Sequence, residues 1–434
     1  MDENTTPDSI ALQKFQLIRC CALIVICILL AKSGLGETGI GQLGIAILIA
    51  GTFCIPGSMI PTILVKLSKG KSRDQQKIIV FNSFLFLFLL SILTSALFFF
   101  SHNAITQFLP EENKIPVPLV LGLFILINGP TRIIESIYLI NSLSKKILTY
   151  RTIISALQLL IVGLLPCFGF GLPTILGGLL CIAIVKFGWL IVVMFRYSKA
   201  KPDRSIRKEM RMQYVSSMTG SIPDSSVFFI AGFILISKFP PNDLAVFQYG
   251  LVGLPLLFLI SNSFERSMLP YIVQRESNSS LAELRSEVYR LIWRFFPLSV
   301  MLILTSHWLF PIVFNPHMTD SATIFNISLL LVTCRVLFPQ TLLRAKNKNN
   351  IVDRISFLGI CITFIMGLWL SNLIGTAGIA YGIVIASIIE KASLMIACKR
   401  KLAIAPSKYL PLRIYTISTT LLILTFIFVE FIRY

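Results

Sequence analysis

Apolar residues in this chain occur in long blocks separated by short polar segments, not in the stripes of a soluble amphipathic helix. A helix rises 1.5 Å per residue, so a block of about twenty apolar residues crosses the roughly 30 Å hydrocarbon core of a bilayer. The pattern therefore predicts thirteen membrane-spanning helices, at residues 12–34, 40–66, 78–100, 115–141, 147–169, 172–197, 214–237, 242–270, 290–314, 320–344, 351–373, 375–398 and 409–432.

Composition supports this pattern, because 55% of the 434 residues are hydrophobic and only 14% are charged. A soluble enzyme of this length would need a far more polar surface. We therefore predict an all-α, polytopic integral membrane protein.

The segment "LLAKSGLGETGIGQLGIAIL" contains glycines spaced as in a dinucleotide-binding loop, at Gly34, Gly36 and Gly39. That loop requires a preceding β-strand. Here the preceding segment, 12–30, is an apolar run of membrane length. The glycines are expected to form a tight turn between two membrane helices instead.

Basic residues predict the orientation of the chain. Only Lys32, Lys114, Lys238 and Arg433, four of the 39 Lys and Arg residues, fall in one set of alternating loops. The positive-inside rule places the other, basic loops in the cytoplasm, together with the N-terminus. The acidic leading segment disfavours a cleaved signal peptide. The net charge of +19 is thus explained by topology, and no nucleic-acid partner is expected.

The nine cysteines lie in or beside apolar blocks, and none has C-x-x-C spacing. They are predicted to be small packing residues, without disulfide or metal-binding roles. No metal and no cofactor are expected.

An internal repeat relates the two halves of the chain. Lys32 recurs as Lys238 after 206 residues, and Arg132 recurs as Arg335 after 203 residues. Six helices separate equivalent positions, so the halves have the same orientation and are expected to be related by an axis along the membrane normal. The predicted domains are a cytoplasmic tail (1–11), a first six-helix bundle (12–200), a basic linker (201–213), a second six-helix bundle (214–398) and a basic loop with an additional helix (399–434).

Three features resemble one known superfamily: the G-x-x-G-x-G turn after the first helix, a proline in the eighth helix, and "LIGTAGIAYG" between the eleventh and twelfth helices. Together with the two six-helix halves, they resemble the multidrug/oligosaccharidyl-lipid/polysaccharide (MOP) exporters, most of all the Wzx-type O-antigen flippases. The resemblance implies a V-shaped pair of bundles around a central cavity that opens alternately to each side. In the flippases this cavity is cationic and receives a polyprenyl-diphosphate-linked oligosaccharide. The thirteenth helix departs from the usual even number.

Ionisable residues inside the membrane are costly and are therefore functional candidates. Arg19, in the first helix, lies at a position equivalent to Ser225, next to Asp224. Pro223 is expected to break the seventh helix there. Arg19 is a candidate to bind cargo and Asp224 to couple transport to an ion, or the two residues pair structurally.

Other charged residues are further candidates for the site. Arg266 could grip a phosphate with its two-pronged guanidinium, or it could extend to the lipid headgroups. Lys186 and Glu390 occupy equivalent positions with opposite charge, and either line the cavity or are neutralised by neighbours. Lys186 is taken as a cargo candidate and Glu390 as a coupling candidate. Trp189 is a candidate for stacking on a sugar.

Arg132 and Arg335 are equivalent in the repeat and lie toward the cytoplasmic side of the fourth and tenth helices. Glu135, one turn after Arg132, is a local partner for its charge. These three residues are predicted to form a structural charge clamp.

The favoured function is a flippase that moves an O-antigen or similar repeat unit across the bacterial inner membrane. A cation-coupled drug exporter is disfavoured because no Asp or Glu lies between Asp8 and Glu37. A membrane glycosyltransferase or polymerase is disfavoured because the longest outer loop, 101–114, is too short for a catalytic domain, so no enzyme is expected. Expected partners are the lipid-linked oligosaccharide, membrane lipids and the polymerase and assembly proteins of the same process.

The charge pattern predicts that the C-terminus lies outside the cytoplasm after thirteen spans. Reporter fusions after Lys401 and at Tyr434 are expected to report opposite sides of the membrane, because the apolar run "IYTISTTLLILTFIFVEF" lies between them. If both fusions report the cytoplasm, the last helix does not span.

Overall fold

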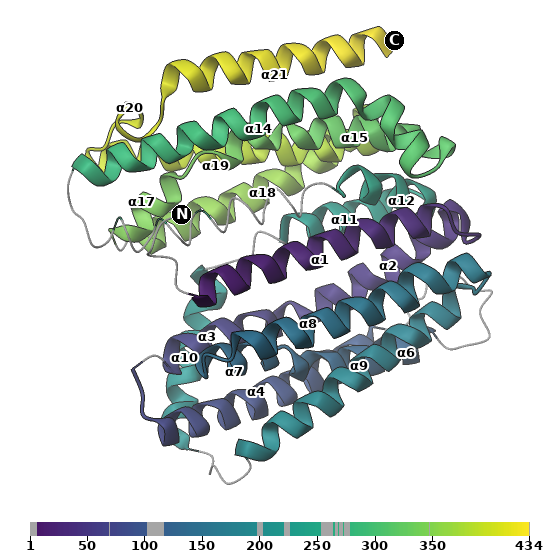
Figure 1. The fold of residues 1–434 in the computed structure, drawn as a ribbon, viewed down its shortest axis with the longest axis vertical. Helices are drawn as coiled ribbons and strands as arrows, with labels where there is room; N and C mark the ends of the chain where they lie inside the picture. The colour runs from purple at the N-terminus through teal and green to yellow at the C-terminus, as the bar shows by residue number, and fades with distance from the viewer. Residues whose placement is uncertain are drawn as a thin grey trace. The chain divides into compact units, whose positions relative to one another are not determined.

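The computed structural model describes residues 7–68, 70–101, 117–197, 203–220, 226–252, 264, 268, 272, 278–346 and 348–433. All regular elements within these residues are helical (Figure 1). Contacts divide the chain into two compact units, Met1–Ser221 and Ile222–Tyr434. The all-α class predicted from the sequence is confirmed for this part of the chain.

The first unit contains the helices α1 (Pro7–Ala31), α2 (Gly36–Cys54), η1 (Pro56–Met59), α3 (Ile60–Ser68), α4 (Arg73–Phe100), α6 (Val117–Thr131), α7 (Ile134–Ile140), α8 (Ser144–Gln158), η2 (Leu159–Leu164), η3 (Leu165–Phe168), α9 (Leu172–Met194), η4 (Phe195–Tyr197) and α10 (Arg204–Gly220). Local chemistry sets several of these bounds. Ser72 and Gln75 form a capping box that starts α4, and Pro56 follows the end of α2.

The second unit contains α11 (Ser226–Lys238), α12 (Pro241–Gly250), α14 (Asn278–Val313), η5 (Pro316–Met318), α15 (Thr319–Leu329), α16 (Leu331–Arg335), α17 (Pro339–Ala345), α18 (Asn349–Ile374), α19 (Thr376–Leu402), α20 (Pro406–Tyr409) and α21 (Leu412–Arg433). Pro339 stands at the start of α17, just after the chain bends.

Among the described residues, nine helices are long and apolar enough to cross a membrane. A tenth candidate is the bent pair Thr319–Arg335 and Pro339–Ala345, whose two parts meet at 40°. These ten coincide with ten of the thirteen predicted spans. Of the other three, 12–34 corresponds to α1, whose apolar stretch Cys20–Ala31 is shorter than a full span, and 214–237 and 242–270 include residues outside the described part, so the count of thirteen stays a prediction.

The glycine-rich segment after α1 is a helix-to-helix turn, as the sequence predicted. Gly36, the first residue of α2, has a φ of +66°, a conformation that residues with a side chain rarely adopt. The element before the glycines is helix α1, so the strand that a nucleotide-binding loop needs is not there. These glycines therefore turn the chain.

The hydrophobic core of the first unit joins α3, α4, α7, α8, α9 and α10. Leu64 of α3, Leu87 of α4 and Ile134 of α7 are fully buried in it. Gly129 lets α6 approach α4 closely, because a Cβ at this position would overlap the Ser91 side chain. Small residues allow such contacts between membrane helices.

The predicted linker at 201–213 is part of a helix that packs on the first unit. Along α10, Met210 and Tyr214 are buried, whereas the basic residues around them are exposed. The Tyr214 hydroxyl donates to the Pro56 carbonyl at 3.1 Å. This apolar face at helical spacing explains why the segment folds against its own bundle. The boundary between the two units falls after Ser221, not before residue 214.

In the second unit, α18 and α19 form a close helical hairpin. Gly375, with a φ of +65°, makes the turn between them. A Cβ on Gly378 would overlap the Leu370 carbonyl, and a Cβ on Gly382 would overlap the backbone of Gly367. The glycines of "LIGTAGIAYG" are therefore required by a turn and by direct backbone contact.

The last helix, α21, lies along α14 at the side of the second unit (Figure 1). A polar network connects it to α14 and α15. The Glu430 carboxylate accepts a hydrogen bond from the Asn326 side chain at 3.1 Å and lies 3.3 Å from Nε2 of His307. Asn326 is 0% exposed, so this network joins the helices within the apolar interior.

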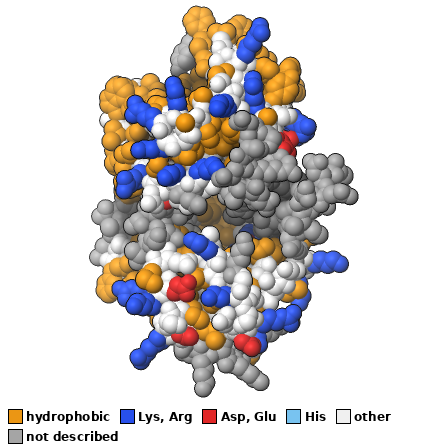
Figure 2. All heavy atoms as spheres, turned by 90° about the vertical axis from the view of Figure 1, so that its left-hand side faces the viewer, with side chains coloured by type: hydrophobic (Ala, Val, Ile, Leu, Met, Phe, Trp, Pro, Cys, Tyr) orange, Lys and Arg blue, Asp and Glu red, His pale blue; other side chains and the backbone are white. Residues whose placement is uncertain are grey.

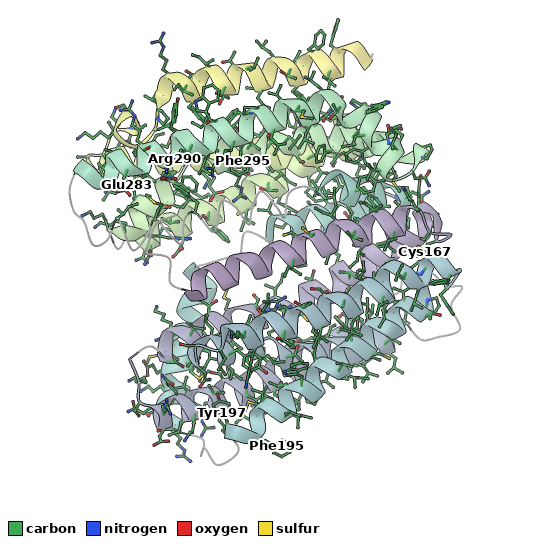
Figure 3. All side chains as sticks on the ribbon, in the orientation of Figure 1. Cys167, Phe195, Tyr197, Glu283, Arg290 and Phe295 are labelled. Carbon is green, nitrogen blue, oxygen red and sulfur yellow. The ribbon has the colours of Figure 1, made fainter. Side chains whose placement is uncertain are left out.

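Basic side chains gather at one end of the helices in each unit, at the starts of α4 and α8 and at the end of α19. Figure 2 shows Lys and Arg side chains spread over the surface of the molecule, with fewer Asp and Glu. Phe195 and Tyr197, after α9, lie at the basic end of the first unit, and Cys167 lies at its opposite end (Figure 3). The charge asymmetry used to predict the topology is therefore present within each unit.

Removing the Glu430 carboxylate is expected to weaken the packing of α21. In Glu430→Ala, the buried Asn326 amide and His307 lose their common partner, which should cost about 1–3 kcal/mol of stability. Thermal unfolding of the purified protein measures this loss. Phe428→Ala, which changes an exposed residue of the same helix, is the control and is expected to stay within about 0.5 kcal/mol. Equal losses in the two variants would contradict the role of the network.

Candidate functional site

The structure describes five of the charged residues predicted to act in transport or as a clamp. Lys186, Glu390, Arg132, Glu135 and Arg335 all lie on described helices or turns. Asp224 and Arg266 lie outside the described residues. Arg19 lies on α1, but its side chain is outside the described part.

A cationic cluster lies inside the first unit, where α2, α6 and α9 meet. Lys186 of α9 donates a hydrogen bond to Oδ1 of Asn128 in α6, at 3.3 Å. Arg132, in the turn that follows α6, hydrogen-bonds with the Cys54 thiol, and Lys186 is within electrostatic range of the same thiol. These described partners are a neutral amide and a thiol. The cluster therefore brings two cationic side chains together with an amide and a thiol inside the first unit.

The backbone of α6 explains how Asn128 and Arg132 reach the cluster. Gly129 brings α6 against α4, and Pro130 follows directly. The helix ends at Thr131, and the next turn is made by hydrogen bonds from Arg132 to Gly129 and from Ile133 to Pro130. A short interruption in the helix thus positions the guanidinium beside Cys54.

The same interruption changes the predicted charge clamp. Glu135 forms an ion pair with Arg151 of α8, whereas the sequence predicted Arg132 as its partner. Since residues 132 and 133 form a turn between α6 and α7, Arg132 and Glu135 are not stacked on one regular helix. The Arg151–Glu135 pair ties α7 to α8, and Arg132 belongs to the cationic cluster.

The second unit has a polar cluster with both charges. Glu390 of α19 accepts a hydrogen bond from the Ser356 hydroxyl of α18, at 2.7 Å. Lys391, only 7% exposed, donates to Oε1 of Gln340 in α17, at 2.6 Å. The two neighbours therefore contact different helices, as expected for adjacent positions on one helix.

Arg335 joins this second cluster at the end of α16. The Cys334 thiol lies within electrostatic range of Arg335, Lys391 and Glu390. The positions that are equivalent in the repeat, Lys186 and Glu390, thus both lie in polar clusters inside their units, each with a neutral hydrogen-bonding partner from a neighbouring helix.

Sequence reasoning missed the partners in these clusters. Asn128, Ser356 and Gln340 stand within the predicted spans, and no spacing rule links them to Lys186, Glu390 or Lys391. The His307–Asn326–Glu430 network was missed for the same reason. A polar residue inside a predicted span is the signal that could have found them.

The Lys186–Asn128 hydrogen bond is expected to link α6 and α9 energetically. Asn128→Leu should lower the stability by about 1 kcal/mol, the usual scale for a hydrogen bond between membrane helices. In the Asn128→Leu/Lys186→Met double variant the loss should be smaller than the sum of the single losses, as measured by denaturation in detergent.

Asn128→Leu combined with Lys238→Met provides the control, because Lys238 contacts α18 in the other unit. Those two losses are expected to add. Additive losses for Asn128 and Lys186 as well would show that their contact contributes nothing.

Comparison with known proteins identifies the family. The family model for "Polysaccharide biosynthesis protein" matches residues 41–322, and no curated protein matches significantly. Among solved structures, the chain is similar to a Lipid II flippase MurJ in an inward closed conformation, with a TM-score of 0.64 at 16% identity and 98% of each chain covered. It is also similar to an inward-facing multidrug resistance MATE transporter of the MOP superfamily, with a TM-score of 0.61 at 12% identity, covering 90% of this chain and 94% of that one. A eukaryotic MATE transporter, AtDTX14, gives 0.57 at 11% identity, with 96% of each chain covered. The chain therefore belongs to the polysaccharide biosynthesis protein family and has the membrane fold of the MOP superfamily.

Proposed function

We propose that the protein is a flippase that moves a polyprenyl-diphosphate-linked oligosaccharide from the cytoplasmic to the outer leaflet of the bacterial inner membrane. The repeat unit of an O-antigen or of a similar surface polysaccharide is the proposed cargo. The family supports a role in polysaccharide biosynthesis, and the MurJ fold is that of a protein that flips a lipid-linked substrate. The N-terminus is proposed to lie in the cytoplasm.

The cationic cluster of Lys186 and Arg132 is the observation that best supports this function. A diphosphate brings at least two negative charges into a medium of low dielectric, where unpaired charges cost many kcal/mol. Lys186 and Arg132 lie on membrane-embedded elements, and their described partners, Asn128 and Cys54, are neutral. These contacts place two cationic side chains close together within the first unit, where they would attract an anionic diphosphate.

In this proposal, Arg19, Arg266 and Lys186 bind the diphosphate. A guanidinium offers two parallel donors to a phosphate, which an ammonium does not. Asp224 and Glu390 are the proposed coupling residues, and Glu390 has a structural basis for this role because it is a carboxylate inside the second unit. Transport proceeds by alternating access of the two bundles, without covalent chemistry. Partners of this process are the polymerase and assembly proteins that use the translocated unit.

A cation-coupled multidrug exporter is the alternative function. The similarity of the fold to MATE transporters and the carboxylate of Glu390 favour it. The two functions differ in cargo charge, because a cationic drug would be repelled by Lys186 and Arg132 and a diphosphate would be attracted. A glycosyltransferase or polymerase is a more distant alternative.

Removing the proposed cargo arginines is expected to block glycan export without loss of protein. In a strain that lacks its own flippase and is complemented by this chain, Arg19→Ala and Arg266→Ala should each reduce surface glycan at least tenfold, since each removes a charge-assisted contact worth about 1.5–3 kcal/mol. Arg→Lys should restore export partly, because the charge remains and the two-pronged geometry is lost. Surface glycan and protein level are measured in the same cells.

Lys399→Ala, at an exposed position in the last turn of α19, is the matched control and should export normally. Full export by the Arg19→Ala/Arg266→Ala variant would refute the cationic site. If protein levels fall instead and a charge-swapped Arg19/Asp224 variant recovers them, the two residues form a structural pair.

In the same assay, Asp224→Asn should impair export and flatten the pH dependence of export. Normal export by this variant would leave Glu390 as the coupling candidate.

A further inference from the structure

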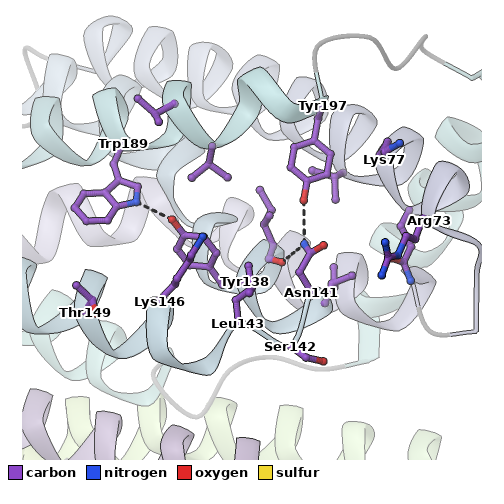
Figure 4. A pocket seen from close by; sticks show the side chains of 16 residues that line it. Arg73, Lys77, Tyr138, Asn141, Ser142, Leu143, Lys146, Thr149, Trp189 and Tyr197 are labelled. Carbon is purple, nitrogen blue, oxygen red and sulfur yellow. Dashed lines mark hydrogen bonds between the residues drawn. The ribbon is translucent and has the colours of Figure 1, made fainter.

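A pocket of about 970 Å³ lies at the basic end of the first unit, apart from the cationic cluster. It is lined by the first turns of α4, by α7 and the turn after it, by the start of α8 and by the end of α9 (Figure 4). None of the charged residues proposed to bind the diphosphate or to couple transport lines it, whereas Trp189, the sequence-based candidate for stacking on a sugar, does. The pocket is therefore a second candidate site within this bundle.

Three cationic side chains line the pocket: Arg73 and Lys77 of α4, and Lys146 of α8. No Asp or Glu is among the residues that line it. Lys77 also contacts Asp74, but that carboxylate is exposed to solvent, so the pair is weak. The electrostatic character of the pocket is thus strongly positive, which favours an anion.

Two tyrosine hydroxyls inside the pocket are held as hydrogen-bond donors. The Tyr138 hydroxyl accepts a hydrogen bond from Nε1 of Trp189 at 2.8 Å, and the Tyr197 hydroxyl accepts one from the Asn141 side chain at 2.9 Å. Both pairs are drawn in Figure 4. Each hydroxyl has its own O–H donor besides the oxygen that accepts these bonds, so each can donate to a ligand in the pocket. An oxygen-rich anion such as a phosphate accepts such bonds.

One side of the pocket is apolar and continues onto a surface that faces outward from the bundle. Val192 lines the pocket and is 68% exposed, and Phe195, one turn further along, is 71% exposed. In a membrane protein such residues contact lipid chains. A ligand that fits both parts has an anionic head and a hydrocarbon chain.

We propose that this pocket binds the phosphate-bearing headgroup of a membrane lipid. Arg73, Lys77 and Lys146 attract the phosphate, the Tyr138 and Tyr197 hydroxyls donate to its oxygens, and the lipid chain lies along the exposed apolar surface at the end of α9. Basic pockets between helices at the cytoplasmic surface are a recurrent means of binding anionic lipids. This site does not depend on whether the protein is a flippase.

Trp189 supplies a fluorescent probe within the pocket. The other three tryptophans, Trp293, Trp308 and Trp369, are 60%, 72% and 57% exposed, so Trp→Phe at these positions removes little packing. The resulting protein, with Trp189 alone, is reconstituted into vesicles of phosphatidylcholine and phosphatidylglycerol in equal amounts. Two preparations are compared, one with brominated phosphatidylglycerol and one with brominated phosphatidylcholine, because bromine quenches the fluorescence of a tryptophan that it contacts.

Brominated phosphatidylglycerol is expected to quench Trp189 more strongly than brominated phosphatidylcholine. Arg73→Gln/Lys77→Gln/Lys146→Gln should reduce the relative affinity for the anionic lipid about fivefold for each charge removed. Lys399→Gln/Arg400→Gln/Lys401→Gln removes the same number of exposed charges at the end of α19 and should leave the preference unchanged. Equal quenching by the two lipids in the parent protein, or equal effects of the two triple variants, would overturn the proposal.

The tyrosine hydroxyls separate a built pocket from general surface charge. Tyr138→Phe/Tyr197→Phe retains all three cations and should still lower the preference for phosphatidylglycerol. A preference that is unchanged in this variant would show that the hydroxyls do not bind the headgroup, and the pocket as proposed would be wrong.

Competition identifies the source of the phosphate. Undecaprenyl diphosphate, unbrominated phosphatidylglycerol and inorganic phosphate are each added against brominated phosphatidylglycerol. Stronger displacement by undecaprenyl diphosphate would assign the pocket to a lipid-linked diphosphate, and stronger displacement by phosphatidylglycerol would assign it to the bulk anionic lipid; both outcomes support the proposal. Displacement by inorganic phosphate as effective as by either lipid would show that no lipid chain is recognised, and would overturn it.

Discussion

Burying a charge among membrane helices requires a partner on a neighbouring helix, and this requirement organises both units. Lys186 contacts the Asn128 amide, Lys391 contacts the Gln340 amide and Glu390 contacts the Ser356 hydroxyl. A hydrogen-bonding dipole on a neighbouring helix lowers the cost of burying a charge. Each contact therefore joins two helices and keeps a formal charge inside the membrane. Helix packing and the proposed binding of an anion depend on the same few hydrogen bonds.

Close approach of the helices makes such short contacts possible. Gly129 brings α6 against α4 just beside Asn128, and Gly378 and Gly382 bring α19 against α18 in the hairpin that holds Glu390. Without a strong hydrophobic force between helices in lipid, packing of small residues and polar contacts supplies the association energy. The small residues thus support the polar ones.

The two halves share a pattern but differ in charge. Two pairs of positions are equivalent in the repeat, Arg132 with Arg335 and Lys186 with Glu390. Both positions are cationic in the first unit, whereas the second unit has one cation and one carboxylate. This asymmetry is what a transporter needs if one half binds an anionic cargo and the other responds to a cation. The additional helix α21 has no counterpart in the repeat, and its contact through Glu430 uses a polar network of its own.

The sequence by itself determined the class of fold, most of the membrane spans, the turn at Gly36 and the uneven distribution of basic residues. These properties depend on the composition of continuous segments, since a span is recognised from about twenty adjacent residues and a turn from a few. The resemblance in pattern also led to the correct superfamily.

Only the tertiary structure decided which charged side chains contact one another. Glu135 pairs with Arg151 instead of Arg132 because the chain turns after Thr131, and α10 packs on the first unit through Met210 and Tyr214. The basic pocket of the first unit combines residues from α4, α7, α8 and α9, and α4 is far from the others in sequence. Such contacts depend on helix rotation and on where each helix ends, and hydrophobic patterning leaves both of these open because lipid-facing and buried positions are equally apolar.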